Sequence, residues 1–182
     1  LIMDVYGGPG AQGVYNTFET NGWHQWLAQN GYVIANINNR GSGGYGSAFE
    51  KCVYMHLGEM ETRDFAEAAL FLVEKQWIDR ENIAIAGHSY GGFSSGMALL
   101  THGDVFKAGI VAAATASHLN YDNIYTERYM GLKELNREGY EKSALITHAG
   151  KLKGEMMLVH GLMDDNVHPQ NAFQLQNAMI DN

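Results

Sequence analysis

The sequence predicts an α/β domain with a mostly parallel sheet. Short apolar runs rich in β-branched residues alternate with segments of helical periodicity, and this alternation is typical of parallel strands joined by helices. The runs are largely apolar at consecutive positions, which indicates strands buried on both faces of the sheet. Five strands are expected, over Leu1–Tyr6, Tyr32–Ile37, Ile83–Ala86, Ala108–Ala113 and Met156–His160.

The helical segments lie between and after these strands. Helices are expected around Trp23–Leu27, over Phe65–Val73, after Gly92 and after Pro169. The pair Asn30-Gly31 predicts the C-terminal end of the first helix, because glycine readily adopts the left-handed conformation found there. Pro169 is suited to the first turn of the last helix, where no backbone N–H is needed.

Residues 117–154 interrupt this alternation of strands and helices. The stretch is polar and tyrosine-rich and stands where a crossover is normally short, so we expect a helical insertion there. No repeat, low-complexity tract or linker divides the 182 residues, which favours one domain. A strand at the first residue and the lack of a closing element after the last helical pattern suggest a domain truncated at both ends.

The composition argues against two classes of partner. Twelve Lys and Arg against twenty Asp and Glu give a net charge of −8. Nucleic acids and anionic membrane surfaces attract a basic face, so we expect neither as a partner. The single cysteine, Cys52, excludes an internal disulfide.

The strongest chemical signal is "IAIAGHSYGGF", residues 83–93. Ser89 stands between a predicted strand and a predicted helix, with Gly87 and Gly91 two positions to either side. A nucleophilic serine must project from a sharp strand-to-helix turn, and these glycines remove the Cβ atoms that would collide in it. The free N–H groups of the following helix can stabilise an oxyanion. The pattern therefore predicts a nucleophile elbow, although a plain glycine-rich turn would also match it.

A serine in such an elbow needs an acid and a base, which follow it in the order Ser, acid, His. Asp164 and Asp165 come just after the last predicted strand, and either can instead cap the helix at Pro169, an interpretation that fits Asp165 in particular. His168 is the histidine that follows Asp164, but it shares a loop with it. The base normally comes from the next strand–helix loop, so His168 is a poor candidate.

Six motifs together match a known family. "DVYGGPG", "NNRGSGGYG", "LGEMETRDF", "GHSYGGF", "YDNIYTERYMG" and "HGLMDDNVH" occur in the family's order. On these motifs the chain resembles the catalytic domain of the prolyl oligopeptidase family of serine peptidases, most closely its dipeptidyl peptidase IV branch. The resemblance implies that residues 1–182 form part of an α/β-hydrolase core. It also implies a serine exopeptidase that releases N-terminal dipeptides, often Xaa-Pro or Xaa-Ala, without a cofactor.

The resemblance assigns catalytic roles position by position. Ser89 matches the nucleophile and Asp164 the acid of the triad. Tyr6 matches the tyrosine whose hydroxyl completes the oxyanion hole, and the backbone N–H of Tyr90 matches the other donor. From its position alone, Tyr6 is simply an aromatic residue at a strand end.

The same resemblance places a pocket for the residue before the scissile bond. Tyr121 and Tyr125 match its lining, Tyr90 and Val167 match further walls, and Asn166 matches a polar contact to the substrate backbone. By spacing alone, Tyr121, Tyr125 and Tyr129 form an i, i+4, i+8 stripe, which is more often core than pocket.

Several features depart from the family pattern. His88 and His118 stand where this branch commonly has tryptophan, which bears on the preference for proline. The family's β-propeller and its catalytic histidine, some tens of residues past the aspartate, fall outside residues 1–182, so we expect the chain alone to be inactive. The resemblance also implies a homodimer of the full-length protein and a secreted, periplasmic or membrane-tethered location, which no residue here indicates.

Two other patterns in the sequence suggest a cofactor site or a metal site. Residues 41–46, "GSGGYG", fit a dinucleotide-binding pattern, but a polar stretch separates them from the preceding strand and no strand ending in an acidic residue appears about twenty residues on. His160, Asp164, Asp165 and His168 match no metal-binding spacing, so no metal is expected. A related acyl-aminoacyl peptidase or esterase, or a non-catalytic interaction module, remains an alternative function.

Overall fold

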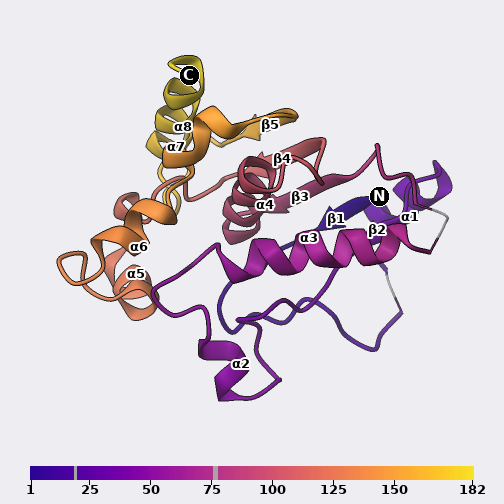
Figure 1. Cartoon of the computed structure of the whole chain (residues 1–182), viewed down its shortest axis with the longest axis horizontal. Helices are drawn as coiled ribbons and strands as arrows, with labels where there is room; N and C mark the ends of the chain where they lie inside the picture. Colours follow the sequence, from indigo (N-terminus) through magenta and orange to yellow (C-terminus); the bar gives the residue numbers. More distant parts are fainter. Residues whose placement is uncertain (19, 76–77) are drawn as a thin grey trace.

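The computed structural model describes residues 1–18, 20–75 and 78–182. Its centre is a five-stranded sheet in the order β2-β1-β3-β4-β5, in which every neighbouring pair is parallel (Figure 1). The strands are β1 Ile2–Asp4, β2 Ile34–Ala35, β3 Ala84–His88, β4 Ala108–Ala112 and β5 Glu155–Val159. The predicted parallel α/β fold is confirmed, with strands shorter than the apolar runs that contain them.

Helices fill the connections between these strands. They are α1 Gly22–Gln29, α2 Ser47–Lys51, α3 Met60–Val73, α4 Tyr90–Thr101, α5 Asn123–Met130, α6 Arg137–Lys142, α7 Leu145–His148 and α8 Gln170–Ile180, with 3-10 turns at His118–Asn120 and Ala149–Lys151. Gly31, just past α1, has a φ of 86°, as expected for a glycine that ends a helix. Helices α5, α6 and α7 all lie within residues 117–154.

One face of the sheet carries the core. Helix α4 packs against β3 and β4, and α3 packs against α4 (Figure 1). Met3, Ile85 and Val111 point to this side and have no solvent exposure. Packing by α4 therefore holds the central strands, and the first turn of α4 follows Ser89 directly.

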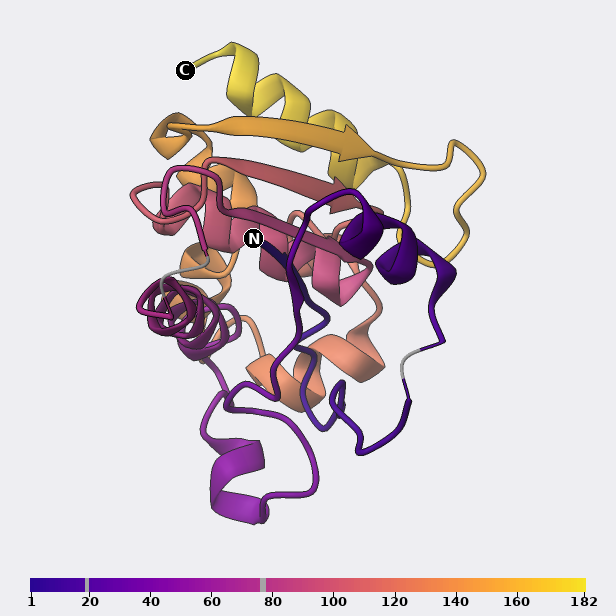
Figure 2. The same cartoon turned by 90° about the vertical axis from the view of Figure 1, so that its right-hand side faces the viewer.

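The other face is covered much less. Helix α1 lies on this side, where His24 Nε2 is 2.6 Å from Asp4 Oδ2 of β1. Further along the sheet Ile110 is 40% exposed, Met157 61% and Val159 42%. The expectation that strands are buried on both faces is wrong for β5 and for Ile110, because among the described residues the covering helices lie mainly on the opposite side (Figure 2).

The parallel arrangement of the strands determines where functional side chains from different loops can come together. Since all five strands run in one direction, the loops that follow β1, β3, β4 and β5 leave the sheet at one edge. Ligand sites of open α/β sheets lie outside this carboxyl edge. These loops carry Tyr6, Ser89, Tyr121 and Asp164 respectively. Among the described helices, none is long and apolar enough to cross a membrane.

Candidate active site

Ser89 occupies a strained turn between β3 and α4. Its φ of 61° and ψ of −122° lie in a region that residues with a side chain rarely adopt. The turn is held on both sides, because Ser89 N–H donates to the Ala112 carbonyl at 2.9 Å and its own carbonyl accepts from Phe93 N–H at 3.0 Å. Backbone strain of this kind persists where the surrounding structure enforces it, often at functional sites.

The flanking glycines are required by close backbone approaches. A Cβ on Gly87 would lie 2.3 Å from the Gly91 carbonyl oxygen, and a Cβ on Gly91 would lie 2.2 Å from the Val5 carbonyl oxygen. Real Cβ atoms do not approach this closely, so the turn and the end of β1 pack together only because both residues are glycine. These contacts place Tyr6, the residue after Val5, beside the turn that carries Ser89.

Tyr6 is fixed through its backbone and given room for its ring. Its carbonyl accepts a hydrogen bond from Ser94 Oγ at 3.0 Å, which ties it to α4. A Cβ on Gly8 would lie 2.6 Å from Tyr6 Cε1, so the ring occupies the space that Gly8 leaves free. Burial, with Tyr121 and Tyr129 nearby, raises the pKa of Tyr6. Its hydroxyl therefore stays protonated and can donate.

Tyr90 follows Ser89 at the start of α4, and its side chain is buried. Its hydroxyl donates to Glu61 Oε1 at 2.9 Å, and Glu61 Oε2 accepts from Gly58 N–H at 3.1 Å. The rings of Tyr90 and Tyr6 are 6.1 Å apart and tilted by 45°. Burial and the neighbouring Glu61 carboxyl raise the pKa of Tyr90 well above its usual value.

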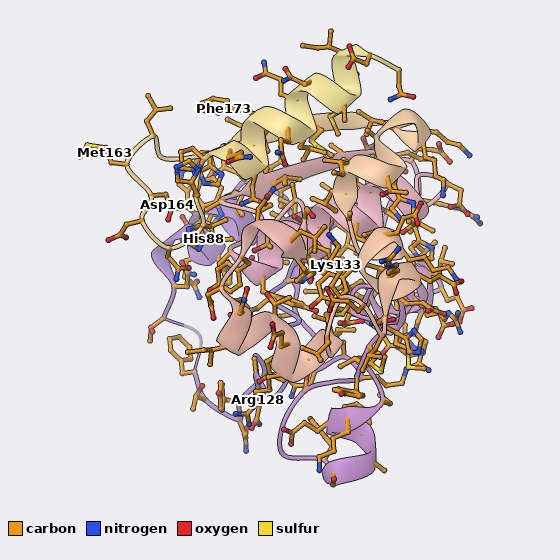
Figure 3. All side chains as sticks on the ribbon, turned by 90° about the vertical axis from the view of Figure 1, so that its left-hand side faces the viewer. His88, Arg128, Lys133, Met163, Asp164 and Phe173 are labelled. Atoms are coloured by element: carbon orange, nitrogen blue, oxygen red, sulfur yellow. The ribbon has the colours of Figure 1, made fainter. Side chains whose placement is uncertain are left out.

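Asp164 organises the loop after β5. Its Oδ1 accepts from the backbone N–H of Val167 at 2.9 Å and of Asn166 at 3.1 Å. His160 Nε2 lies 2.7 Å from the Val167 carbonyl oxygen and 3.5 Å from Asp164 Oδ2. Asp164 Oδ2 accepts no hydrogen bond from these two amides, and its 3.5 Å contact with His160 Nε2 is longer than a typical hydrogen bond. His88 and Asp164 lie at the same end of the molecule (Figure 3).

The loop after β5 also contains His168 and Asp165. His168 Nδ1 accepts from Gln170 N–H at 3.2 Å, so this imidazole is engaged with the first turn of α8. The N-cap of α8 is Pro169, with no side-chain capping bond, so the capping role considered for Asp165 is wrong.

The tyrosines after β4 form a cluster next to Tyr6. Tyr121 precedes α5, whereas Tyr125 and Tyr129 lie on it, and their rings contact in sequence at 5.4 Å and 4.8 Å. Tyr121 hydroxyl donates to Asn166 Oδ1 at 3.2 Å, which joins this cluster to the loop that carries Asp164. All three are half-buried, and Val167 is buried. Burial and the nearby hydroxyl of Tyr6 raise the pKa of Tyr125.

Two residues were not assigned a role from the sequence. Glu61 lies inside the recognised motif "LGEMETRDF", but an acidic residue in the first turn of a helix is commonly explained by the helix dipole alone. His160 was considered only as a metal ligand. No cluster of three or more metal-binding side chains occurs among the residues that the structure describes.

His118 is buried against Phe93, with ring centroids 4.9 Å apart. Burial lowers its pKa to about 4, so the imidazole is neutral at ordinary pH. His88, in contrast, is exposed at the end of β3.

The glycines of residues 41–46 have a packing role. Gly10 N–H donates to the Gly41 carbonyl at 2.8 Å, and a Cβ on Gly43 would lie 2.6 Å from the Gly10 carbonyl oxygen. The segment therefore lies against the loop that follows β1.

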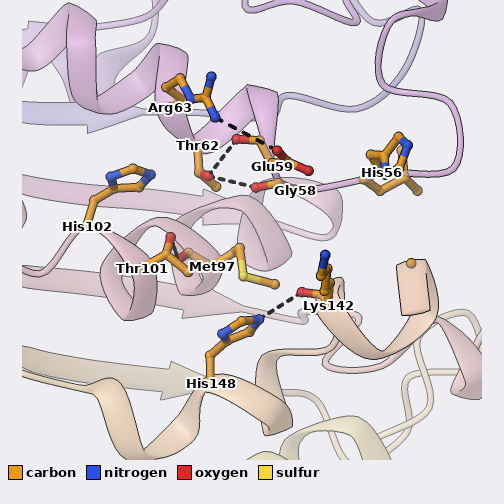
Figure 4. A pocket seen from close by; sticks show the side chains of 12 residues that line it. His56, Gly58, Glu59, Thr62, Arg63, Met97, Thr101, His102, Lys142 and His148 are labelled. Carbon is orange, nitrogen blue, oxygen red and sulfur yellow. Dashed lines mark hydrogen bonds and ion pairs between the residues drawn. The ribbon is translucent and has the colours of Figure 1, made fainter. Parts of the chain in front are cut away.

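A separate cavity of about 380 Å³ lies beside α3, α4 and α6 (Figure 4). His56, Arg63, His102, Lys142 and His148 line it, together with the apolar Met97 and Leu57. Several polar groups are already engaged, since Arg63 is 3.8 Å from Glu59 and His148 Nε2 is 2.8 Å from the Lys142 carbonyl oxygen. None of the predicted site residues lines this cavity.

A parallel sheet with a strained serine between a central strand and its helix, and with an aspartate after a later strand, defines a serine hydrolase of the α/β-hydrolase type. The profile of the prolyl oligopeptidase family matches residues 18–182. The chain therefore belongs to this family of serine peptidases.

Individual relatives agree with this assignment. The chain is 41% identical over 184 residues to prolyl endopeptidase FAP of Mus musculus and 39% identical over 185 residues to dipeptidyl peptidase 4 of Trichophyton equinum; 99% of the chain is covered in both comparisons. The crystal structure of Porphyromonas gingivalis dipeptidyl peptidase 4 superposes with a TM-score of 0.96 at 38% identity, covering 99% of this chain and 26% of that one. The chain spans about a quarter of the length of the curated relatives, 24% of each.

Proposed function

We propose that the chain is part of the α/β-hydrolase domain of a longer serine exopeptidase that releases dipeptides from peptide N-termini. The observation that carries this proposal is the strained elbow at Ser89, packed directly against Tyr6 and followed by Tyr90. Relatives named dipeptidyl peptidase 4 support the dipeptide-releasing specificity.

In the proposed mechanism, Ser89 Oγ attacks the scissile carbonyl while a histidine outside residues 1–182 takes its proton. Asp164 orients that histidine through Oδ2, the carboxylate oxygen that the two loop amides do not use. The Tyr6 hydroxyl and the Tyr90 backbone N–H stabilise the tetrahedral oxyanion. The histidine then protonates the leaving amine, and water hydrolyses the acyl-enzyme to release the dipeptide and regenerate Ser89.

The surroundings of the two histidines in the Asp164 loop support a base from elsewhere. His160 is held against the Val167 carbonyl and His168 against the backbone of α8. Neither is presented toward the elbow by a hydrogen bond in the described structure.

The pocket for the residue before the scissile bond is proposed to lie between Tyr90, Tyr121, Tyr125 and Val167, with Asn166 facing the substrate backbone. The link between Tyr121 and Asn166 supports this arrangement, because it brings the two loops to one place. Apolar and aromatic walls suit a proline or alanine side chain.

The name of the mouse relative favours a second candidate, an endopeptidase that cleaves after proline. The two functions are separated by measuring hydrolysis of Gly-Pro-p-nitroanilide and of its N-blocked form by the full-length protein. An exopeptidase cleaves only the free-amine substrate, whereas an endopeptidase also cleaves the blocked one. N-acetyl-Ala-anilide and short p-nitrophenyl esters test the acyl-peptidase and esterase alternatives, and Ser89→Ala should abolish every activity.

We also propose, from the family resemblance, that the full-length protein is a homodimer. Light scattering on the purified full-length protein measures its mass directly, and a monomer at micromolar concentration contradicts the proposal.

A further inference from the structure

Glu61 is a buried carboxyl with a specific partner beside the elbow. Its side chain has no solvent exposure, and its two oxygens have separate donors, the Tyr90 hydroxyl and the Gly58 backbone N–H. Burying a carboxyl is costly unless hydrogen bonds compensate for lost hydration. We therefore expect the buried Glu61 carboxyl to have a role that offsets this cost, through the groups to which it is bound.

The position of Glu61 in α3 makes it a rigid anchor. It lies in the first turn of α3, whose N-terminal end attracts negative charge, and its bond to Gly58 fixes the carboxyl in orientation. Thr62, the next residue, donates through Oγ1 to the Gly58 carbonyl at 2.7 Å. The Tyr90 hydroxyl is thus held by a carboxyl whose other oxygen is bound to Gly58, a residue that Thr62 in turn ties to α3.

Tyr90 connects this anchor to the reacting centre. Its backbone N–H is one proposed oxyanion donor, and its ring lies 6.1 Å from the ring of Tyr6, the other donor. The Tyr90 ring also packs edge-on against Phe93, with ring centroids 5.1 Å apart. Rotation of the Tyr90 side chain is therefore limited by Glu61 at its tip and by aromatic rings along its body.

We propose that Glu61 is a positioning residue for catalysis, which acts through the Tyr90 hydroxyl to align the Tyr90 N–H and the Tyr6 hydroxyl on the oxyanion. This inference rests on the proposed function, because it assumes that those two groups are the oxyanion donors. A merely structural Glu61 would instead tie α3 to α4 without affecting the chemical step.

The test uses Glu61→Gln, Glu61→Ala and Tyr90→Phe in the full-length protein, with Glu59→Gln as the matched control. Glu59 is exposed and two positions away, so its change removes a charge from the same helix end without touching Tyr90. Steady-state kcat and KM are measured with the best substrate, and the second-order rate of fluorophosphonate labelling reports on the oxyanion hole independently of substrate binding. Thermal melting identifies variants that fail to fold.

We expect Glu61→Ala and Tyr90→Phe each to lower kcat and the labelling rate by about tenfold or more, since displacements near 1 Å at a reacting centre can cost about 100-fold. Glu61→Gln keeps one oxygen for the Tyr90 hydroxyl and should recover part of the rate. Combining Glu61→Ala with Tyr90→Phe should cost no more than the larger single loss, because both changes break the same contact. Glu59→Gln should stay within about twofold of wild type by the same reasoning of independent sites.

The inference would be overturned if the losses of the single variants multiply in the double variant. It would also be overturned if Glu61→Gln and Glu61→Ala both fold and keep the wild-type kcat and labelling rate. A fall in melting temperature without a change in kcat would assign Glu61 a structural role only. Failure of the proposed function gives a different result: the wild-type protein itself then shows no peptidase activity that depends on Ser89.

Discussion

The substitution Gly91→Ala sets two effects of opposite sign against each other. Gly91 lies in helix α4, and replacing a helical glycine by alanine normally stabilises a protein by about 1 kcal/mol. Here the new Cβ would lie 2.2 Å from the Val5 carbonyl oxygen and 3.1 Å from Tyr6 Cα. Because ordinary van der Waals contacts begin at 3.4 Å, the end of β1 and the start of α4 must separate by about 1 Å.

The expected cost exceeds the gain in helix propensity. Overpacking of this size typically costs about 1–3 kcal/mol, and the obstacle here is backbone, which cannot rotate away. We expect a net loss of about 2 kcal/mol and a corresponding fall in the melting temperature. The displaced segment carries Tyr6, so kcat should fall by about 100-fold as the two oxyanion donors move apart.

The matched control is Gly22→Ala, a helical glycine in α1 whose added Cβ would meet nothing within 4 Å. This variant should melt at or slightly above the wild-type temperature and retain full activity. Both variants are compared in the full-length protein by thermal melting and by hydrolysis of Gly-Pro-p-nitroanilide. A Gly91→Ala protein as stable and active as Gly22→Ala would refute the close approach of β1 to α4.

Three further predictions follow from the site. Tyr6→Phe should lower kcat by about 100-fold with little change in KM, because a hydroxyl donor is lost only from the transition state; an unchanged kcat in steady-state kinetics excludes this role. Asp164→Asn keeps an oxygen for the two loop amides but lacks the charge that orients an imidazolium, so kcat should fall on the order of 10⁴-fold, and a loss below tenfold contradicts its assignment. Burial raises the pKa of Glu61 from 4.5 to about 7, so native protein holds this proton more tightly than unfolded protein. The free energy of unfolding, relative to that of Glu61→Gln, should therefore decline by about 3 kcal/mol as pH rises from 4.5 to above 7. Urea denaturation of both proteins at each pH measures this difference. Parallel pH profiles of the two proteins would contradict a raised pKa of Glu61.

The order of strands along the chain could be predicted, because each strand is marked locally by an apolar run. The spatial order β2-β1-β3-β4-β5 could not be read in this way. Pairing of Ile2 with Ala84 joins residues far apart in the sequence and depends on how helices pack. Burial of β5 was overestimated for the same reason, since an apolar run does not show which element of the fold covers it.

The elbow at Ser89 was visible in the sequence because the steric need for glycine is local. The position of Tyr6 beside it was implied only by the family resemblance, since the contact that creates it joins Gly91 to Val5 across the sheet. Glu61 was missed because a carboxyl in a first helical turn has an adequate local explanation. Its partner Tyr90 comes from another helix, and only the packing of α3 against α4 brings the two together.

The central claim is that Ser89 is the activated nucleophile of a serine peptidase. Treating the full-length protein with a fluorophosphonate and mapping the adduct by peptide mass spectrometry tests it most directly. We predict a single stoichiometric adduct on Ser89 that Ser89→Ala removes together with peptidase activity. An adduct on another residue, or labelling and hydrolysis that survive in Ser89→Ala, would contradict the account.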